Sequence, residues 1–213
     1  MRSRDLILIS TLFLSFVIAL PSAHALPVGA PGRTVEVGGF SLSGTIGYTD
    51  LEVRNSDVTT KSFFFKGAFG GTDGVTPYLR LGFADLEVEG GFKGNLGFAF
   101  GGGVLLDLIT QQSGSGFRVS LDSQAQWSES SEGSASYDMF EGQVSLLGSA
   151  RSSGTNAYAG IATSFINLDG EKDDGQAHLF FGMDYFMDYN FFFSAEAHLF
   201  GQDTLSIGVG YNF

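Results

Sequence analysis

The last ten residues of the chain alternate without interruption between apolar and small or polar side chains. One set contains only apolar and aromatic residues, namely Leu205, Ile207, Val209, Tyr211 and Phe213. The other set contains Ser206, Gly208, Gly210 and Asn212. Successive side chains of a β-strand point to opposite sides, so each set occupies one face. A strand of a membrane β-barrel needs this division, with apolar groups toward lipid, small polar groups toward the lumen and aromatic residues at the membrane interface.

Nine more segments show this alternation or the composition of a strand. They span residues 35–48, 59–70, 75–84, 95–108, 117–128, 137–150, 157–168, 178–185 and 191–199. In the segment 157–168 the pattern does not decide which face points inward. Outer-membrane barrels close on themselves with an even number of antiparallel strands. The sequence therefore predicts an all-β fold, a closed antiparallel up-and-down transmembrane barrel of ten strands, with eight strands as the alternative.

The N-terminus has the layout of a secretory signal peptide. Arg2 and Arg4 precede an apolar run at 6–20, and the small-residue pattern that ends at Ala25 follows. The run is shorter than the ~20 residues that span a membrane as a helix, so we expect cleavage after Ala25 rather than an anchor. The chain contains no cysteine, which excludes a lipoprotein, disulfides and a thiolate metal site.

These features predict three regions in the chain. Residues 1–25 form the signal peptide, residues 26–34 a short periplasmic lead-in that contains two prolines and two glycines, and residues 35–213 the outer-membrane barrel. A mature chain of this length fits one domain.

Acidic residues are concentrated in alternate links between the predicted strands. The formal net charge is −12, and removal of residues 1–25 leaves 9 basic and 22 acidic residues, a balance of −13. The links at 50–60, 85–95, 129–138, 167–176 and 201–203 together carry −11, whereas the short links between them carry −1. Outer-membrane barrels have short periplasmic turns and longer outer loops, so we expect both termini in the periplasm and an acidic outer rim. This acidity argues against nucleic acid as a partner.

Several segments resemble strands of the bacterial outer-membrane β-barrel domain family. They read TPYLRLGFAD at 76–85, GFAFGGGV at 97–104, YAG at 158–160 and GVGYNF at 208–213. The family includes opacity-like surface proteins and OmpA-type membrane domains. The resemblance implies a barrel and brings no catalytic residues. It also implies that Tyr211 and Phe213 belong to the C-terminal signal that the barrel assembly machinery reads during biogenesis.

Charged side chains on the inward faces predict a polar network in the lumen. Its members are Arg80, Arg118, Asp122, Glu141, Asp184 and Glu196, with Lys66 on the same inner surface. One interpretation is a constriction that selects solutes. The other is mutual charge compensation in a packed interior, because the lumen of a small barrel is just wide enough for side chains to fill. We favour the packed interior and leave slow passage of small solutes open.

Two inward histidines, His178 and His198, are predicted on adjacent strands joined by the turn at 187–190. They indicate either a metal site or histidine–acid pair of the kind that outer-membrane enzymes use, or hydrogen-bonded lumen groups. Two histidines without a third converging ligand fit a metal site poorly. We therefore expect no catalytic residues, no cofactor and no metal, with these histidines as the candidates if a metal binds.

The predicted function is that of a non-enzymatic outer-membrane barrel with a structural or surface-interaction role. It has acidic extracellular loops and a largely plugged polar lumen, and the alternative is a narrow porin-like channel for small or apolar solutes. The expected partners are outer-membrane lipids and lipopolysaccharide, whose phosphates divalent cations would bridge to the acidic loops. A monomer is expected.

Overall fold

The computed structural model describes most of the predicted barrel and a short segment before it. The described residues are 26–28, 35, 37–53, 56–72, 74–89, 91–110, 116–152, 154–168, 171–173, 177–188, 190–200 and 203–213. The predicted signal peptide at 1–25 lies outside them, as does most of the predicted lead-in. None of the described residues belongs to a helix long and apolar enough to cross a membrane.

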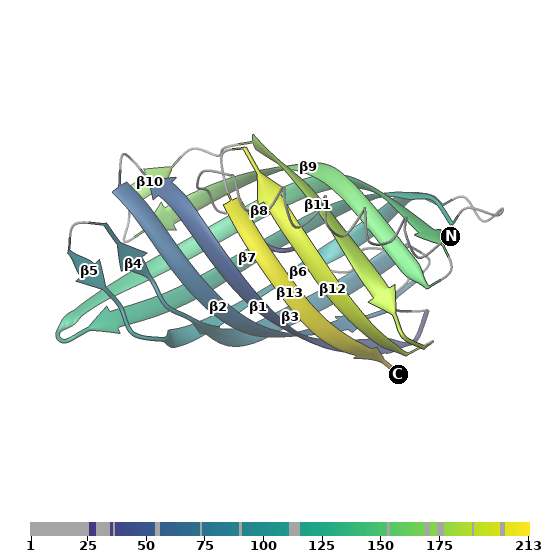
Figure 1. Ribbon diagram of the computed structural model, residues 1–213, viewed down its shortest axis with the longest axis horizontal. Coiled ribbons are helices and arrows are strands. Elements are labelled where there is room, and N and C mark those ends of the chain that lie inside the picture. Colours follow the sequence, from purple (N-terminus) through teal and green to yellow (C-terminus); the bar gives the residue numbers. More distant parts are fainter. Residues whose placement is uncertain are drawn as a thin grey trace, which may run out of the picture.

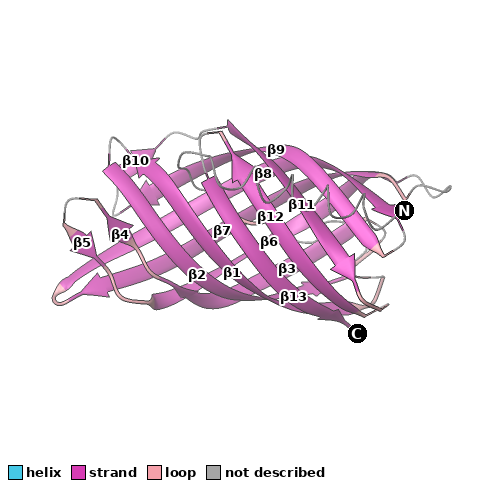
Figure 2. Ribbon diagram, viewed as in Figure 1, coloured by secondary structure: helices cyan, strands magenta, loops and turns pink. Residues whose placement is uncertain are grey.

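Ten long antiparallel strands form the wall of a closed barrel (Figure 1). They are β1 (Phe40–Val53), β2 (Ser56–Phe69), β3 (Val75–Ala84), β6 (Gly97–Thr110), β7 (Arg118–Glu132), β8 (Ala135–Ser152), β9 (Thr155–Leu168), β11 (Ala177–Phe186), β12 (Phe191–Leu199) and β13 (Asp203–Asn212). Each strand pairs with the next along the chain, and the described residues are drawn only as strand and loop in Figure 2. The predicted ten-stranded antiparallel barrel is confirmed, and the eight-stranded alternative is wrong.

The first and last strands close the barrel. β1 and β13 pair from Ser41 opposite Asn212 to Asp50 opposite Asp203. Beyond this ladder the Phe213 N–H donates to the Phe40 carbonyl over 2.7 Å. An unpaired backbone group in lipid costs several kcal/mol, so this closure removes the edge that an open sheet would present to the bilayer.

The two ends of the barrel differ in how the strands are linked. At one end, called here the turn end, the wall strands are joined across 70–74, 111–117, 153–154 and 187–190, and the C-terminus lies there. At the opposite end, the loop end, three further short strands lie in the links: β4 (Glu87–Val88), β5 (Phe92–Lys93) and β10 (Glu171–Asp173). β4 follows β3 in the chain and pairs with the same neighbouring strand, β2. β5 pairs with β4.

One predicted loop is instead the tip of a long hairpin. β7 and β8 remain paired as far as Glu132 opposite Ala135. The two residues between them form the turn, and Gly133 has a φ of 61°, a conformation that glycine adopts without a steric penalty. The loop predicted at 129–138 is therefore wrong, because a two-residue turn lets both strands continue.

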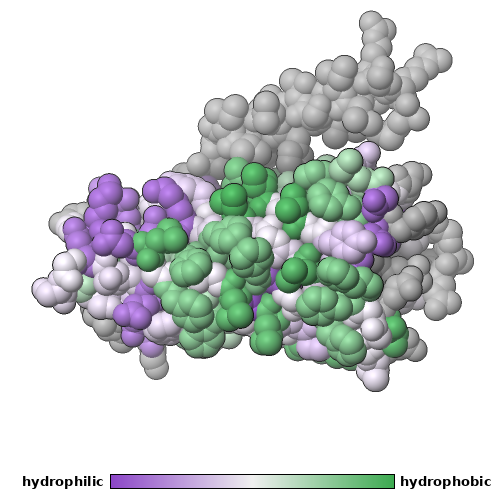
Figure 3. All heavy atoms as spheres, turned by 90° about the horizontal axis from the view of Figure 1, so that it is seen from below, coloured by the Kyte–Doolittle hydropathy of each residue, from purple (hydrophilic) through white to green (hydrophobic). Residues whose placement is uncertain are grey.

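The outer surface is apolar around the middle of the barrel. Figure 3 shows a hydrophobic band on one face, with hydrophilic residues gathered at the loop end on the left. Outward side chains in this band are strongly exposed to the surroundings, for example Leu79 at 70%, Ile46 at 59% and Ile207 at 58%. An apolar belt of this extent is unfavourable in water and suits a lipid bilayer.

Aromatic side chains lie on either side of the band. Nearer the loop end, contacts between rings join Phe83 to Phe98, Phe98 to Phe100, Phe100 to Trp127, and Phe140 to Phe165. At the turn end, the Phe213 ring lies 4.9 Å from Tyr211 and 6.1 Å from Phe40, measured between ring centroids. Two aromatic girdles of this kind mark the membrane interfaces of outer-membrane barrels.

Candidate functional site

The lumen is the candidate functional site, because period-two alternation directs the polar face of each strand inward. Five of the six charged residues predicted there are buried inside it. Their exposed fractions are 6% for Arg80, 0% for Asp122, 1% for Glu141, 0% for Asp184 and 2% for Glu196.

The sixth residue, Arg118, lies apart from this group. It stands at the start of β7 near the turn end, where its guanidinium donates to the Asp107 carboxylate. Ser120 donates to the other oxygen of Asp107 over 2.7 Å. Arg118 therefore forms a local ion pair between β6 and β7.

A segment of the chain's own N-terminal region occupies the lumen. The Leu26 N–H donates to Gln143 Oε1 over 3.0 Å. The Leu26 carbonyl accepts from Gln143 Nε2 at 3.0 Å and from Gln124 Nε2 at 3.1 Å. The Leu26 side chain is 3% exposed, so β7 and β8 hold this residue inside the barrel by its backbone and bury its side chain.

The next two residues bind the other side of the lumen. The Pro27 carbonyl accepts from the guanidinium of Arg80, and the Val28 carbonyl accepts from Lys66 Nζ over 2.8 Å. The Val28 N–H donates to Glu196 Oε1 over 2.7 Å. Side chains of β2, β3, β7, β8 and β12 thus bind three consecutive residues, which are called the plug below.

The plug bears on two of the predictions made from sequence. Residues 26–28 were predicted as part of a periplasmic lead-in, whereas they lie in the lumen because their backbone groups match inward polar side chains. Mutual charge compensation stays a prediction, and Arg80 and Lys66 in addition donate hydrogen bonds to carbonyl groups of the plug. Part of the lumen is therefore filled by the chain's own backbone.

Two tyrosines, absent from the predicted network, connect its carboxylates to neighbouring groups. The Tyr78 hydroxyl donates to Asp122 over 2.8 Å and contacts Gln124 Oε1 at 3.2 Å. The Tyr158 hydroxyl donates to Glu196 over 2.7 Å. Lys66 Nζ lies 4.1 Å from the centre of the Tyr78 ring, a cation–π distance. The inward position of Tyr78, two residues before Arg80, is the sequence signal that indicates its role.

Two apolar layers cross the lumen, so it is less polar than the sequence predicted. The first packs Val28 of the plug against side chains of β6, β8, β9 and β11, namely Leu105, Leu147, Tyr158, Ala162 and Phe180. The second lies at the loop end and contains Val58, Leu86, Phe92, Met139 and Ile166. Its members come from β2, from the link that holds β4 and β5, and from β8 and β9, which face β2 across the barrel. This loop-end layer lies on the loop-end side of the plug.

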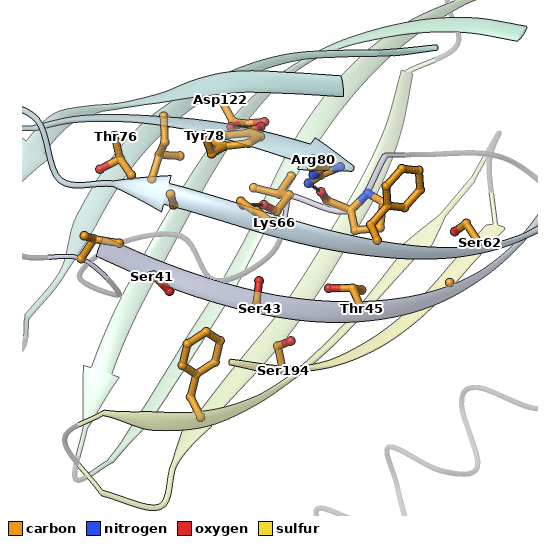
Figure 4. Close-up of a pocket in the computed structure, with 18 residues that line it drawn as sticks. Ser41, Ser43, Thr45, Ser62, Lys66, Thr76, Tyr78, Arg80, Asp122 and Ser194 are labelled. Carbon is orange, nitrogen blue, oxygen red and sulfur yellow. Dashed lines mark hydrogen bonds between the residues drawn. The ribbon is translucent and has the colours of Figure 1, made fainter. Parts of the chain in front are cut away.

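A cavity of about 50 Å³ remains beside the plug. Its wall includes hydroxyl side chains of β1 and β12, and Figure 4 shows Ser41, Ser43 and Thr45 in a row along β1 with Ser194 nearby. Lys66, Arg80 and Asp122 contribute the charged part of the lining, and Phe64, Tyr78 and Phe192 the aromatic part. A buried water needs roughly 10–15 Å³ on this kind of measure, so the space suits a few waters.

The two inward histidines lie side by side near the loop end of β11 and β12. The ring centroids of His178 and His198 are 5.2 Å apart, and both residues are almost fully buried. His198 Nε2 lies 2.5 Å from Glu196 Oε1, and its ring stacks on Phe180 at 5.2 Å. Among the described residues no group of three or more His, Cys, Asp or Glu is arranged to hold a metal ion. A structural role for both histidines stays a prediction.

The acidic rim at the loop end contains ion pairs. Lys93 Nζ lies 2.9 Å from Glu87 Oε1 across the β4–β5 pair, and the Lys93 N–H donates to Glu132 over 2.9 Å. The hydrogen bond from Lys93 holds the pKa of Glu87 below its ordinary value, and the same bond raises the pKa of Lys93. Both side chains are substantially exposed, so screening by solvent keeps the interaction weak.

Comparison with known proteins identifies the fold alone. No protein-family model matches the chain, and no curated protein matches it. Among solved structures, an outer membrane channel from Pseudomonas putida F1 has a TM-score of 0.52 at 10% identity, covering 89% of this chain and 100% of that one. The beta domain of the Bordetella autotransporter BrkA has a TM-score of 0.49 at 13% identity, covering 84% and 99%. OprG from Pseudomonas aeruginosa has a TM-score of 0.43 at 10% identity, covering 85% and 99%. The chain has the fold of an outer-membrane β-barrel.

Proposed function

We propose that this chain is a closed outer-membrane barrel with a structural, surface-displaying role. The observation that carries the proposal is the plug, whose three residues bind side chains of five wall strands inside the lumen. The loop-end apolar layer adds a second barrier. A lumen filled by hydrogen-bonded backbone and packed side chains serves a rigid anchor better than a pore.

The proposed orientation has the turn end in the periplasm and the loop end outside. It is supported by the difference between the links, since outer-membrane barrels keep short turns on the periplasmic side, and by the excess of acidic residues in the loop-end links. In this orientation the acidic rim faces the lipopolysaccharide headgroups, where divalent cations would bridge carboxylates to phosphates. Tyr211 and Phe213 then lie at the periplasmic interface as the proposed assembly signal.

A non-enzymatic role is part of the proposal. Among the described residues, the arrangement most like an acid–base pair is His198 with Glu196, at 2.5 Å. Glu196 also accepts from the Val28 N–H and the Tyr158 hydroxyl, and His198 is 1% exposed. Because a general base needs access to a substrate proton, this arrangement favours a structural role for the pair.

A narrow channel for small solutes is the second candidate. It is favoured by the cavity beside the plug, which shows that the hydroxyl-lined wall of β1 is not fully packed. The likeness to the Pseudomonas putida outer membrane channel also fits this candidate. Such a channel would require the plug and the loop-end layer to move.

Conductance in planar lipid bilayers separates the two candidates. We expect no steady single-channel steps from the purified wild-type protein. A variant lacking residues 26–28 should show frequent brief openings, since ions then meet hydrated polar side chains up to the loop-end layer. A matched deletion in the exposed tip at 133–134 should stay closed. Steady steps from the wild type would refute the closed barrel and favour the channel.

A further inference from the structure

Three buried oxygen acceptors without a partner lie close to the first residue of the plug. Both carboxylate oxygens of Glu141 lack a hydrogen bond among the described residues, as does Gln126 Oε1. Glu141 is 1% exposed and Gln126 is 8% exposed. A buried carboxylate without a hydrogen bond is strongly unfavourable, so these three acceptors at one point of the lumen favour a nearby donor.

The strand register places these acceptors near the Leu26 nitrogen. Glu141 and Gln126 are direct cross-strand partners on β8 and β7, which brings their side chains together on the inner surface. Glu141 is two residues from Gln143, so both project from the same face of β8. Gln143 Oε1 accepts from the Leu26 N–H at 3.0 Å. The same N–H acts on Glu141 as a backbone donor, although outside the distance and angle limits of a hydrogen bond.

The direction in which the plug runs through the lumen also places Leu26 near Glu141. Val28 binds Lys66 near the turn end of β2, whereas Leu26 binds Gln143 in the middle of β8. Glu141 lies further toward the loop end along β8. Within the plug, the Leu26 nitrogen therefore lies on the side that faces Glu141 and Gln126.

Cleavage after Ala25 would change the hydrogen-bonding capacity of that nitrogen. A signal peptidase uses one water molecule to hydrolyse the peptide bond between Ala25 and Leu26. The water oxygen stays on the Ala25 carbonyl carbon, which leaves as a carboxylate, and the Leu26 nitrogen takes up protons to become an ammonium. A peptide nitrogen donates one hydrogen, whereas an ammonium donates three and carries a positive charge.

We propose that the lumen contains a binding site for the mature chain's own N-terminal ammonium, in which Gln143, Glu141 and Gln126 accept its three hydrogens. The proposal rests on the closed barrel proposed above and on cleavage after Ala25. The site matches the cleaved chain in both charge and donor number. The precursor, with one peptide hydrogen at this position, leaves the carboxylate unmatched, so removal of the leader completes the plug.

Chemical labelling of the α-amine in the folded mature protein tests the site. The protein is isolated from envelopes, its N-terminus is confirmed by mass spectrometry, and it is treated with formaldehyde and cyanoborohydride near neutral pH. Lys93, whose side chain is 75% exposed, serves as the internal reference. We expect the Leu26 α-amine to react about tenfold more slowly in the folded protein than in urea, because reaction requires local opening.

Two variants separate the ammonium site from general burial. Glu141→Gln should raise the labelling rate of the α-amine. The matched Asp184→Asn should leave it low, since Asp184 bonds Asn156 at 2.9 Å and makes no hydrogen bond to the plug among the described residues. A glycine inserted between Ala25 and Leu26 moves the ammonium along the chain and should also raise the rate. Folding of each variant is checked by heat-modifiable gel migration, and the wild-type result stands even if Glu141→Gln does not fold.

The outcomes distinguish this proposal from the closed barrel. Labelling of the wild-type α-amine as fast in the folded protein as in urea, or a mature chain that begins elsewhere, would overturn the ammonium site. If conductance is absent in that case, the closed barrel stands without it. Steady wild-type conductance would instead overturn the closed barrel, whichever labelling rate is found.

Discussion

Replacing Ile207 by Arg on the outer face of β13 should destabilise the barrel in a lipid bilayer. Ile207 is 58% exposed and lies between Ile46 of β1 and Ala195 of β12. The guanidinium would therefore project from the wall into the hydrocarbon rather than into a protein contact. Because a lipid-facing charge is most costly at the bilayer midplane, the depth of this residue sets the size of the effect.

The depth follows from the strand geometry. A strand rises about 3.4 Å per residue, and a tilt of about 40° from the barrel axis leaves about 2.6 Å of depth per residue. Ile207 is four residues from Tyr211 in the turn-end girdle, so it lies about 10 Å inside a band of about 25 Å, close to the midplane. We expect Ile207→Arg to cost about 2–4 kcal/mol, and Val209→Arg, at about half that depth, to cost about half as much.

Denaturant titration in phospholipid vesicles measures these costs. The chain has a single tryptophan, Trp127, whose ring packs 5.3 Å from Phe100 on the outer wall, so its emission reports folding without a label. Ile207→Met is the control, because an unbranched apolar side chain of similar length can stay in lipid, and we expect it within about 0.5 kcal/mol of wild type. Equal stability of the Arg and Met variants, or a larger cost at 209 than at 207, would refute the assigned facing and depth.

Three further perturbations test other parts of the structure. Gly82→Ala would place a Cβ 2.0 Å from the Phe63 carbonyl oxygen, so it should lower the free energy of unfolding by about 1–3 kcal/mol. The control Gly91→Ala, whose Cβ would have no atom within 4 Å, should lower it little. Equal losses for both variants in the same denaturant titration would contradict the close approach at Gly82. Lys93→Gln should raise the pKa of Glu87 toward its ordinary value in an NMR titration in micelles, and an unchanged pKa would exclude the ion pair as the cause. In the wild type the depressed pKa of Glu87 gives stability that is present above the unfolded-state pKa and is lost as the pH falls through the folded-state pKa, with little change in unfolding free energy because the pair is exposed. Deleting Phe213 should reduce heat-modifiable protein in envelopes more than refolding yield in detergent, and equal loss in both would argue against a recognition step.

The strands of the barrel wall could be predicted from the sequence because the alternation within each strand shows which side chains face outward. The segment 75–84 alternates so regularly that its predicted bounds coincide with β3. The alternation is less informative where inward residues are apolar, as at Phe180 and Phe192, which are 2% and 1% exposed. Such residues form layers across the lumen, and a two-residue period cannot distinguish an apolar lumen contact from lipid.

The plug could not be predicted because its contacts are not local. Leu26 and Gln143 are separated by 117 positions, and Val28 and Glu196 by 168. Three residues that include a proline show no period, so their proline and glycine neighbours indicated only a loop. The inward glutamines at 124 and 143 were visible in the pattern, but nothing local identified the backbone they bind. The partner of Arg118 was missed for a different reason: Asp107 is only 11 positions away, but the pairing depends on the register between β6 and β7, which shifts next to Asp107.

The hairpin tip between β7 and β8 gives this barrel a natural grafting position. Residues 133–136 are exposed and stand at the end of two strands that stay paired to Glu132 and Ala135. Insertions are tolerated best at exposed tips whose backbone makes few long-range hydrogen bonds. A peptide epitope spliced between Gly133 and Ser134 would be carried on a ribbon whose base is fixed in the wall. In the orientation proposed above, the protein would offer a scaffold for presenting foreign sequences on the cell surface while its interior is left unchanged.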